Sequence, residues 1–176
     1  MSEYRKTHPG GLYFVTLTVM GWLDVFNREW HVEELVNNLK YCQRKEGLEI
    51  FAYVIMSSHL HLIAGRGEND LGELLGRFKS VTAKKILKLI EDHPQESRKE
   101  WLLYLFRYFA KNKQQYDEHH FWHYTNRPVE LYSNAVIDQK VDYIHNNPRE
   151  AGIVTEPQYY KWSSANPDSP IKVLPL

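Results

Sequence analysis

Two histidines, His59 and His61, lie one residue apart in an apolar region that spans residues 50–63. A polar pair, Ser57-Ser58, divides this region, so the sequence predicts two β-strands, 48–56 and 59–64, joined as a hairpin. Successive side chains of a strand point to opposite faces, so both imidazoles leave the second strand on the same face. Two imidazoles held side by side on a rigid strand are a candidate bidentate clamp for a metal ion.

The chain of 176 residues has 43% hydrophobic residues, which predicts one domain over 1–176. The N-terminus has no apolar segment of the signal-peptide type, and no stretch approaches the roughly 18 apolar residues of a membrane span. A single cysteine, Cys42, excludes an internal disulfide, and we expect a protein of the reducing cytoplasm without membrane association. The 22 basic and 22 acidic side chains balance, so any nucleic-acid binding must come from a local patch.

The other predicted elements follow from hydrophobic periodicity. They are a strand over 12–22 and helices over 32–45, 70–91, 96–111 and 134–147, with Gly47 ending the first helix and Pro148 the last. The order strand, helix, strand, strand, helix predicts an α+β sandwich of ferredoxin-like (RRM-like) type. Its central antiparallel sheet would carry helices packed on one face.

The last predicted helix presents a phenol and an amide on one side. Tyr143 and Asn147 are four residues apart and therefore stack on one helical face. If this face lies over the histidine strand, two imidazoles and one amide oxygen can bind a divalent cation beside the phenol. Such a donor set suits Mg²⁺ or Mn²⁺ completed by waters and does not exclude Zn²⁺. Asn146 competes for the third position, since it lies about 60° from Tyr143 around the helix, against about 40° for Asn147.

These segments together resemble a known family. The His-hydrophobic-His strand, the segment Phe121-Trp122 and the run Pro128 to Ser133 precede Asp142-Tyr143-Ile144-His145-Asn146-Asn147-Pro148, and Trp162-Ser163-Ser164-Ala165 follows. Their order is similar to that of the single-tyrosine HUH transposases, and most similar to the REP-associated tyrosine transposases of bacteria. The likeness spans most of the chain, although Ser57-Ser58 stands where many relatives carry Pro-Asn or a similar pair.

The resemblance implies that the HUH strand is central in the sheet. His59, His61 and Asn147 would be the metal ligands and Tyr143 the nucleophile, with both histidines counted among the catalytic residues. Family members cut single-stranded DNA, often beside a hairpin, and form a 5′-phosphotyrosine link. The expected enzyme would act at the bacterial nucleoid as a monomer or homodimer. Residues 93–118 look like a helical and loop insertion, and 155–176 like an irregular C-terminal tail.

Several other features have competing interpretations. Arg77, Lys84 and Lys88 share one side of the predicted 70–91 helix and form a candidate phosphate track for DNA, although such a stripe is usually a solvated helix face. His119, His120 and His123 suggest a second metal site, but we expect a solvated loop there. By helical geometry His145 faces away from Tyr143, and Trp101 is expected in the core.

The sequence therefore predicts a metal-dependent endonuclease and strand transferase acting on single-stranded or hairpin DNA. The main alternative is a non-catalytic DNA- or RNA-binding module on the same fold. A third hypothesis is a metal-dependent hydrolase that uses an activated water, in which Tyr143 would be dispensable.

Overall fold

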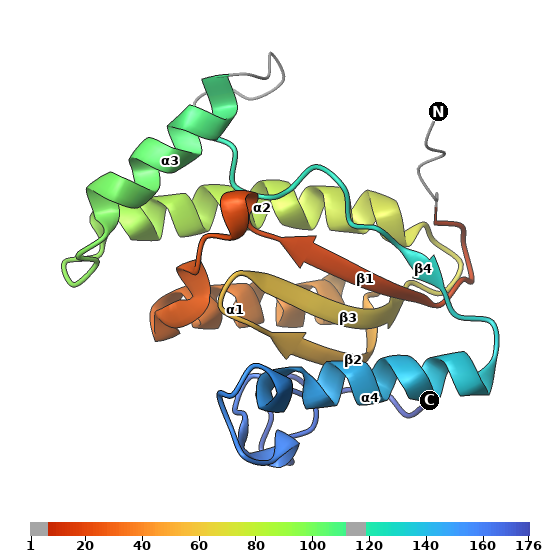
Figure 1. Ribbon diagram of the computed structural model, residues 1–176. Helices are drawn as coiled ribbons and strands as arrows, with labels where there is room; N and C mark the ends of the chain where they lie inside the picture. Colours follow the sequence, from red (N-terminus) through yellow and green to blue (C-terminus); the bar gives the residue numbers. More distant parts are fainter. Residues whose placement is uncertain (1–6, 112–118) are drawn as a thin grey trace.

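The chain builds a four-stranded antiparallel sheet in the order β2-β3-β1-β4 (Figure 1). The structure, a computed structural model, describes residues 7–111 and 119–176. The strands are β1 (Tyr13–Thr18), β2 (Glu49–Ile55), β3 (His59–Gly65) and β4 (Val129–Glu130). The predicted hairpin is confirmed, because β2 and β3 pair directly and the Met56 amide donates to the His59 carbonyl at 2.8 Å. The histidine strand β3 is central, between β2 and β1.

The predicted helices are all present, with ends shifted by a few residues. They are α1 (Glu29–Lys45), α2 (Leu71–Asp92), α3 (Lys99–Lys111) and α4 (Asn134–Glu150), with short 3-10 turns η1 (Met20–Trp22), η2 (Val25–Asn27) and η3 (Pro157–Tyr159). Side-chain caps explain two of the starts. The Asp70 carboxylate accepts from the Gly72 and Glu73 amides before α2, and the Ser133 hydroxyl accepts from the Val136 amide in α4.

Helices cover both faces of the sheet, whereas the sequence predicted them on one. The larger apolar cluster packs alternate residues of β1 and β3, such as Leu17 and Leu62, against α1 and α2. The smaller cluster packs Phe14 of β1 and Ile63 of β3 against Ile144 of α4. The α+β sandwich is therefore confirmed, with α4 as the only cover of the second face among the described helices (Figure 1).

The first strand ends earlier than predicted. Strand pairing with β3 stops at Thr18, and the chain then turns through η1, where Gly21 and Trp22 have φ of 64° and 56°. These left-handed values are incompatible with a strand. The aromatic and β-branched residues up to Trp22 therefore led to a predicted strand that is too long.

The prediction that Pro148 ends the last helix was wrong, because α4 continues to Glu150. A proline in a helix removes one hydrogen bond and crowds the carbonyl four residues earlier, and this local cost is tolerated close to the helix end. The final turn closes without that hydrogen bond, since the Ala151 amide donates to the Asn147 carbonyl at 3.0 Å and the Ile153 amide to the Pro148 carbonyl at 2.9 Å. The Pro148 ring is also buried, so packing favours the extra turn.

The predicted insertion and the C-terminal tail both take part in packing. Leu102 and Phe106 of α3 belong to the larger cluster, while Trp101 is 50% exposed, contrary to its predicted core position. The last part of the insertion, 112–118, lies outside the described residues. The tail is irregular after η3, as predicted, and runs along the edge of β2, where Ser163 forms a bridge with Val54. Of the described helices, none combines the length and apolarity needed to cross a membrane.

Candidate active site

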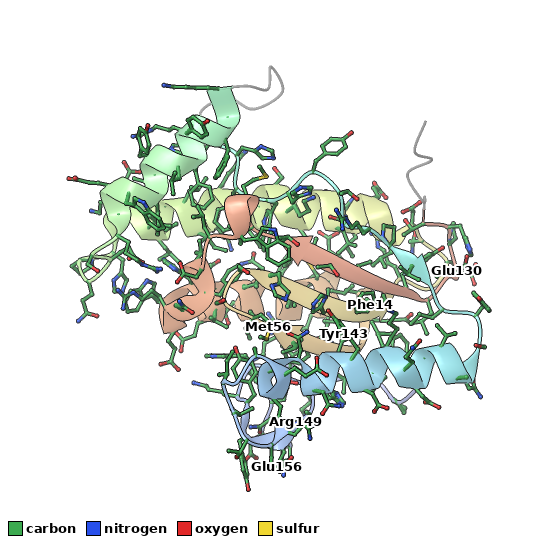
Figure 2. The ribbon with its side chains drawn as sticks, viewed as in Figure 1. Phe14, Met56, Glu130, Tyr143, Arg149 and Glu156 are labelled. Carbon is green, nitrogen blue, oxygen red and sulfur yellow. The ribbon has the colours of Figure 1, made fainter. Side chains whose placement is uncertain are left out.

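The side chains of His59, His61 and Tyr143 meet on the face of the sheet that α4 covers. The two imidazole centroids are 4.7 Å apart, and the His61 and Tyr143 rings are 5.3 Å apart in an edge-to-face contact. Figure 2 shows Tyr143 on the side of α4 toward the sheet, close to Phe14 of β1, and their ring centroids are 5.8 Å apart. The structure therefore brings the two histidines and the tyrosine together.

His61 is buried and held in one orientation. Its Nδ1 is 2.8 Å from the Thr16 hydroxyl on the paired strand β1, and Phe14 stacks on its ring. Burial, helped by His59 and the Lys140 ammonium, lowers the pKa of His61 to about 3. The imidazole is therefore neutral at physiological pH, which is the state that binds a metal ion.

The donor set fits a divalent metal ion. The Nε2 atom of His61 is buried and makes no hydrogen bond within the described residues, while Nδ1 is anchored by Thr16. An imidazole with one anchored nitrogen and one open nitrogen is the arrangement found in metal-binding histidines. His59 is half-buried, with Nδ1 3.2 Å from the Ser58 hydroxyl, and burial lowers its pKa as well.

On α4, the structure separates the two candidate asparagines. The Asn146 amide donates to the Asp142 carbonyl of its own helix at 2.9 Å. Asn147 is half-buried and makes no side-chain hydrogen bond within the described residues, and its assignment as the third metal ligand stays a prediction. His145 lies at 2.9 Å from the Ser164 hydroxyl, which gives it a structural contact with the C-terminal tail.

The nucleophile candidate is accessible. Tyr143 is 42% exposed, so the residue is open to solvent beside the buried His61. One helical turn earlier, the Lys140 ammonium lies 4.7 Å from the centroid of the Phe14 ring and 5.7 Å from that of Tyr143. Both distances are within the range of a cation–π contact, so Lys140 adds a positive charge beside the phenol.

The basic stripe of α2 is not part of this cluster. Arg77, Lys84 and Lys88 belong to a helix that packs on the opposite face of the sheet. Arg77 pairs with Glu46 and Glu73 at 2.5 and 2.9 Å, and Lys88 pairs with Asp92 at 3.1 Å. Their role in DNA binding stays a prediction.

The histidines after α3 differ from the predicted solvated loop, because His120 is only 1% exposed. Within the described residues, no group of three or more His, Cys, Asp or Glu side chains could hold a metal ion. The observed part of the candidate metal site is therefore the imidazole pair His59 and His61.

Thr16, Lys140 and Trp22 were not identified from the sequence as site residues. Lys140 is three residues before Tyr143, a helical spacing that could have identified it. Thr16 becomes a site residue only through its register with His61, and Trp22 only through the turn that brings its ring 5.4 Å from that of His59.

Comparisons with known proteins bear on the fold and on the family resemblance. No family model matches the chain. A Haemophilus influenzae protein named as a REP-associated tyrosine transposase is 26% identical over 176 residues, which cover 99% of this chain and 92% of that protein. A solved structure of a REP-associated tyrosine transposase bound to a REP hairpin has the same fold, with a TM-score of 0.64 at 19% identity. That match covers 93% of this chain and 82% of the solved chain. The resemblance predicted from the sequence is thus confirmed: over nearly its whole length this chain is similar to a protein named as a REP-associated tyrosine transposase, and it shares the fold of a solved one.

Proposed function

We propose that this protein is a DNA-processing enzyme of the transposase type, a metal-dependent endonuclease and strand transferase for single-stranded or hairpin DNA. The observation that carries the proposal is the meeting of His59, His61 and an accessible Tyr143 on one face of the sheet. The two relatives support the DNA substrate, since one is a transposase by name and the other is bound to a REP hairpin.

In the proposed reaction the Tyr143 oxygen attacks the phosphorus of a phosphodiester. An O–P bond forms to the tyrosine, the bond from phosphorus to the 3′-oxygen breaks, and that oxygen takes a proton to leave as a 3′-hydroxyl. The phenol proton passes to solvent. The 5′-phosphotyrosine keeps the energy of the phosphodiester, so a 3′-hydroxyl can attack it in turn and rejoin strands.

The residues around Tyr143 have distinct parts in this step. Phe14 packs against the phenol ring and fixes its direction, and the Lys140 ammonium supplies positive charge beside the phosphate. His59, His61 and Asn147 would hold the metal ion, with Thr16 orienting His61. When bound, Mg²⁺ or Mn²⁺ would polarise the phosphate and stabilise the charge that develops on its oxygens.

The test is a gel assay for a covalent protein–oligonucleotide adduct, with labelled hairpin DNA and Mn²⁺. We expect Tyr143→Phe to abolish the adduct and leave folding and DNA binding unchanged, since only the nucleophilic oxygen is removed. Tyr132→Phe is the matched control, because Tyr132 is 84% exposed and lies just before α4, outside the cluster of site residues.

Each alternative gives a different result in the same assay. If Tyr143→Phe still cleaves at the normal rate, a hydrolase that uses an activated water replaces the transferase. If the wild-type protein binds hairpin DNA and never cleaves it, the fold serves as a non-catalytic binding module. Equal affinity for plain duplex and for hairpin DNA would contradict the transposase proposal as a whole.

A further inference from the structure

The turn η1 holds an exposed tryptophan beside the candidate metal site. Trp22 is 65% exposed, and its indole lies 5.4 Å from the His59 ring at an angle of 71°. Large aromatic side chains usually bury most of their surface. Here the neighbouring imidazole is half-buried while the indole stands in solvent.

The backbone of this turn is strained and firmly held. Trp22 has a φ of 56°, which is rare for a bulky residue and is found where the surrounding structure imposes it, often at functional sites. Gly21 before it also has a positive φ, and a Cβ there would come within 2.5 Å of the Phe109 ring of α3. The helix of the predicted insertion therefore packs directly under the turn.

Hydrogen bonds tie the turn to the histidine hairpin. The Val19 amide donates to the Ser58 carbonyl at 2.9 Å, and the Phe26 amide donates to the Ser57 carbonyl at 2.8 Å. The segments on either side of Trp22 are thus both anchored to the two residues that precede His59. These bonds fix the backbone that carries Trp22 next to the site, and the indole ring lies 5.4 Å from the His59 ring.

We infer that Trp22 is a stacking platform for an unpaired nucleobase next to the phosphate at the Tyr143 site. This inference rests on the proposed function and names the element that holds the single strand there. An indole has no charge to attract a phosphate and can offer it only one N–H donor, whereas its large flat ring matches the π-face of a base. Stacking of this kind accepts any base, so Trp22 would hold the strand without reading its sequence.

The experiment is an abasic scan of the single-stranded flank of a labelled hairpin, with binding measured by fluorescence anisotropy. The Tyr143→Phe background prevents cleavage during the measurement. With Trp22 present, we expect one or two abasic positions to weaken binding about 5- to 150-fold, the factor that corresponds to stacking of ~1–3 kcal/mol. In Trp22→Leu the penalty at those positions should disappear, while Trp22→Phe should keep most of it.

Trp101→Leu is the matched control, because Trp101 is a half-exposed tryptophan on α3 whose loss should leave the abasic profile unchanged. The inference is overturned if no abasic penalty depends on Trp22, or if Trp101→Leu removes the same penalty. The two proposals fail separately. A normal covalent adduct without any coupling to Trp22 rejects only the stacking platform. A Trp22-dependent abasic penalty in a protein that forms no adduct rejects only the transferase.

Discussion

The two faces of the sheet differ in what their side chains do. The face under α1 and α2 is apolar along its length and contributes most of the buried core. The face under α4 has a smaller apolar cluster, which gives way to Thr16, His61 and His59 toward one end of β1 and β3. The difference teaches that one strand can contribute to the apolar core with one side and to the proposed active site with the other.

This division is sharpest within a single dipeptide of β3. Leu62 is fully buried in the larger cluster, whereas its neighbour His61 is buried with an open nitrogen toward α4. A buried polar atom without a hydrogen-bond partner lowers the free energy of unfolding. Each such atom in a native protein calls for an explanation, and a functional role is one of them. A substitution at Leu62 should therefore reduce mainly the stability of the protein, and a substitution at His61 mainly its affinity for a metal ion.

The largest expected effect on stability is that of Leu62→Ala. Removing a fully buried leucine side chain leaves a cavity and should lower the free energy of unfolding by about 2–5 kcal/mol. Denaturant unfolding followed by circular dichroism measures this loss. Metal affinity of the remaining folded protein should stay near the wild-type value, and a large drop in that affinity would mean that the two faces are not independent.

His61→Ala should reduce metal affinity more than it reduces stability. We expect it to weaken Mn²⁺ binding in calorimetry by at least about 100-fold, since Thr16→Val, which removes only the orienting hydrogen bond, should itself cost about 10- to 100-fold. The free energy of unfolding should fall by less than in Leu62→Ala, because the removed imidazole also carries an unsatisfied nitrogen, and the loss of that penalty offsets part of the lost packing. His8→Ala, an exposed histidine paired with Glu130, is the control. Unchanged Mn²⁺ affinity in His61→Ala would refute the proposed site.

Much of the fold follows from local patterns in the sequence. The hairpin at Ser57-Ser58 and the helices were predicted because hydrophobic periodicity and caps such as Asp70 act over a few residues. Predictions failed where a longer-range contact overrode such a pattern. The run up to Trp22 has strand propensity, but anchoring to Ser58 and packing on Phe109 turn the chain after Thr18.

Only the local part of the candidate site could be predicted from patterns in the sequence. Spacing within one element places His59 beside His61 and Tyr143 beside Asn147, but spacing alone cannot place one element over another. The family resemblance supplied that step. Thr16 was missed because its contact with His61 depends on the register between strands, which a single sequence does not reveal.

The smallest expected effect concerns the basic stripe of α2, on the face away from the histidines. Helical spacing predicted that Arg77, Lys84 and Lys88 share a side, but it could not tell which face of the sheet their helix covers. Exposed ion pairs contribute little to stability, so the acidic partners of Arg77 and Lys88 do not prevent these side chains from binding phosphate. Lys84 has no ion pair within the described residues, so it is the most available of the three.

Replacing Arg77, Lys84 and Lys88 together by Gln should therefore reduce the slope of log affinity for hairpin DNA against log salt. We expect a reduction of about 1 for each phosphate that the variant no longer neutralises, with Lys84 contributing first. Anisotropy titrations from about 50 to 200 mM salt measure the slope. Lys140→Gln on the active-site face is the comparison, with an expected reduction of about 1.

A wild-type slope in the triple variant, together with a reduced slope in Lys140→Gln, would confine DNA binding to the α4 face. The α2 stripe would then be a solvated surface, and the separation between a stabilising face and a functional face would extend to the outer surface of the helices.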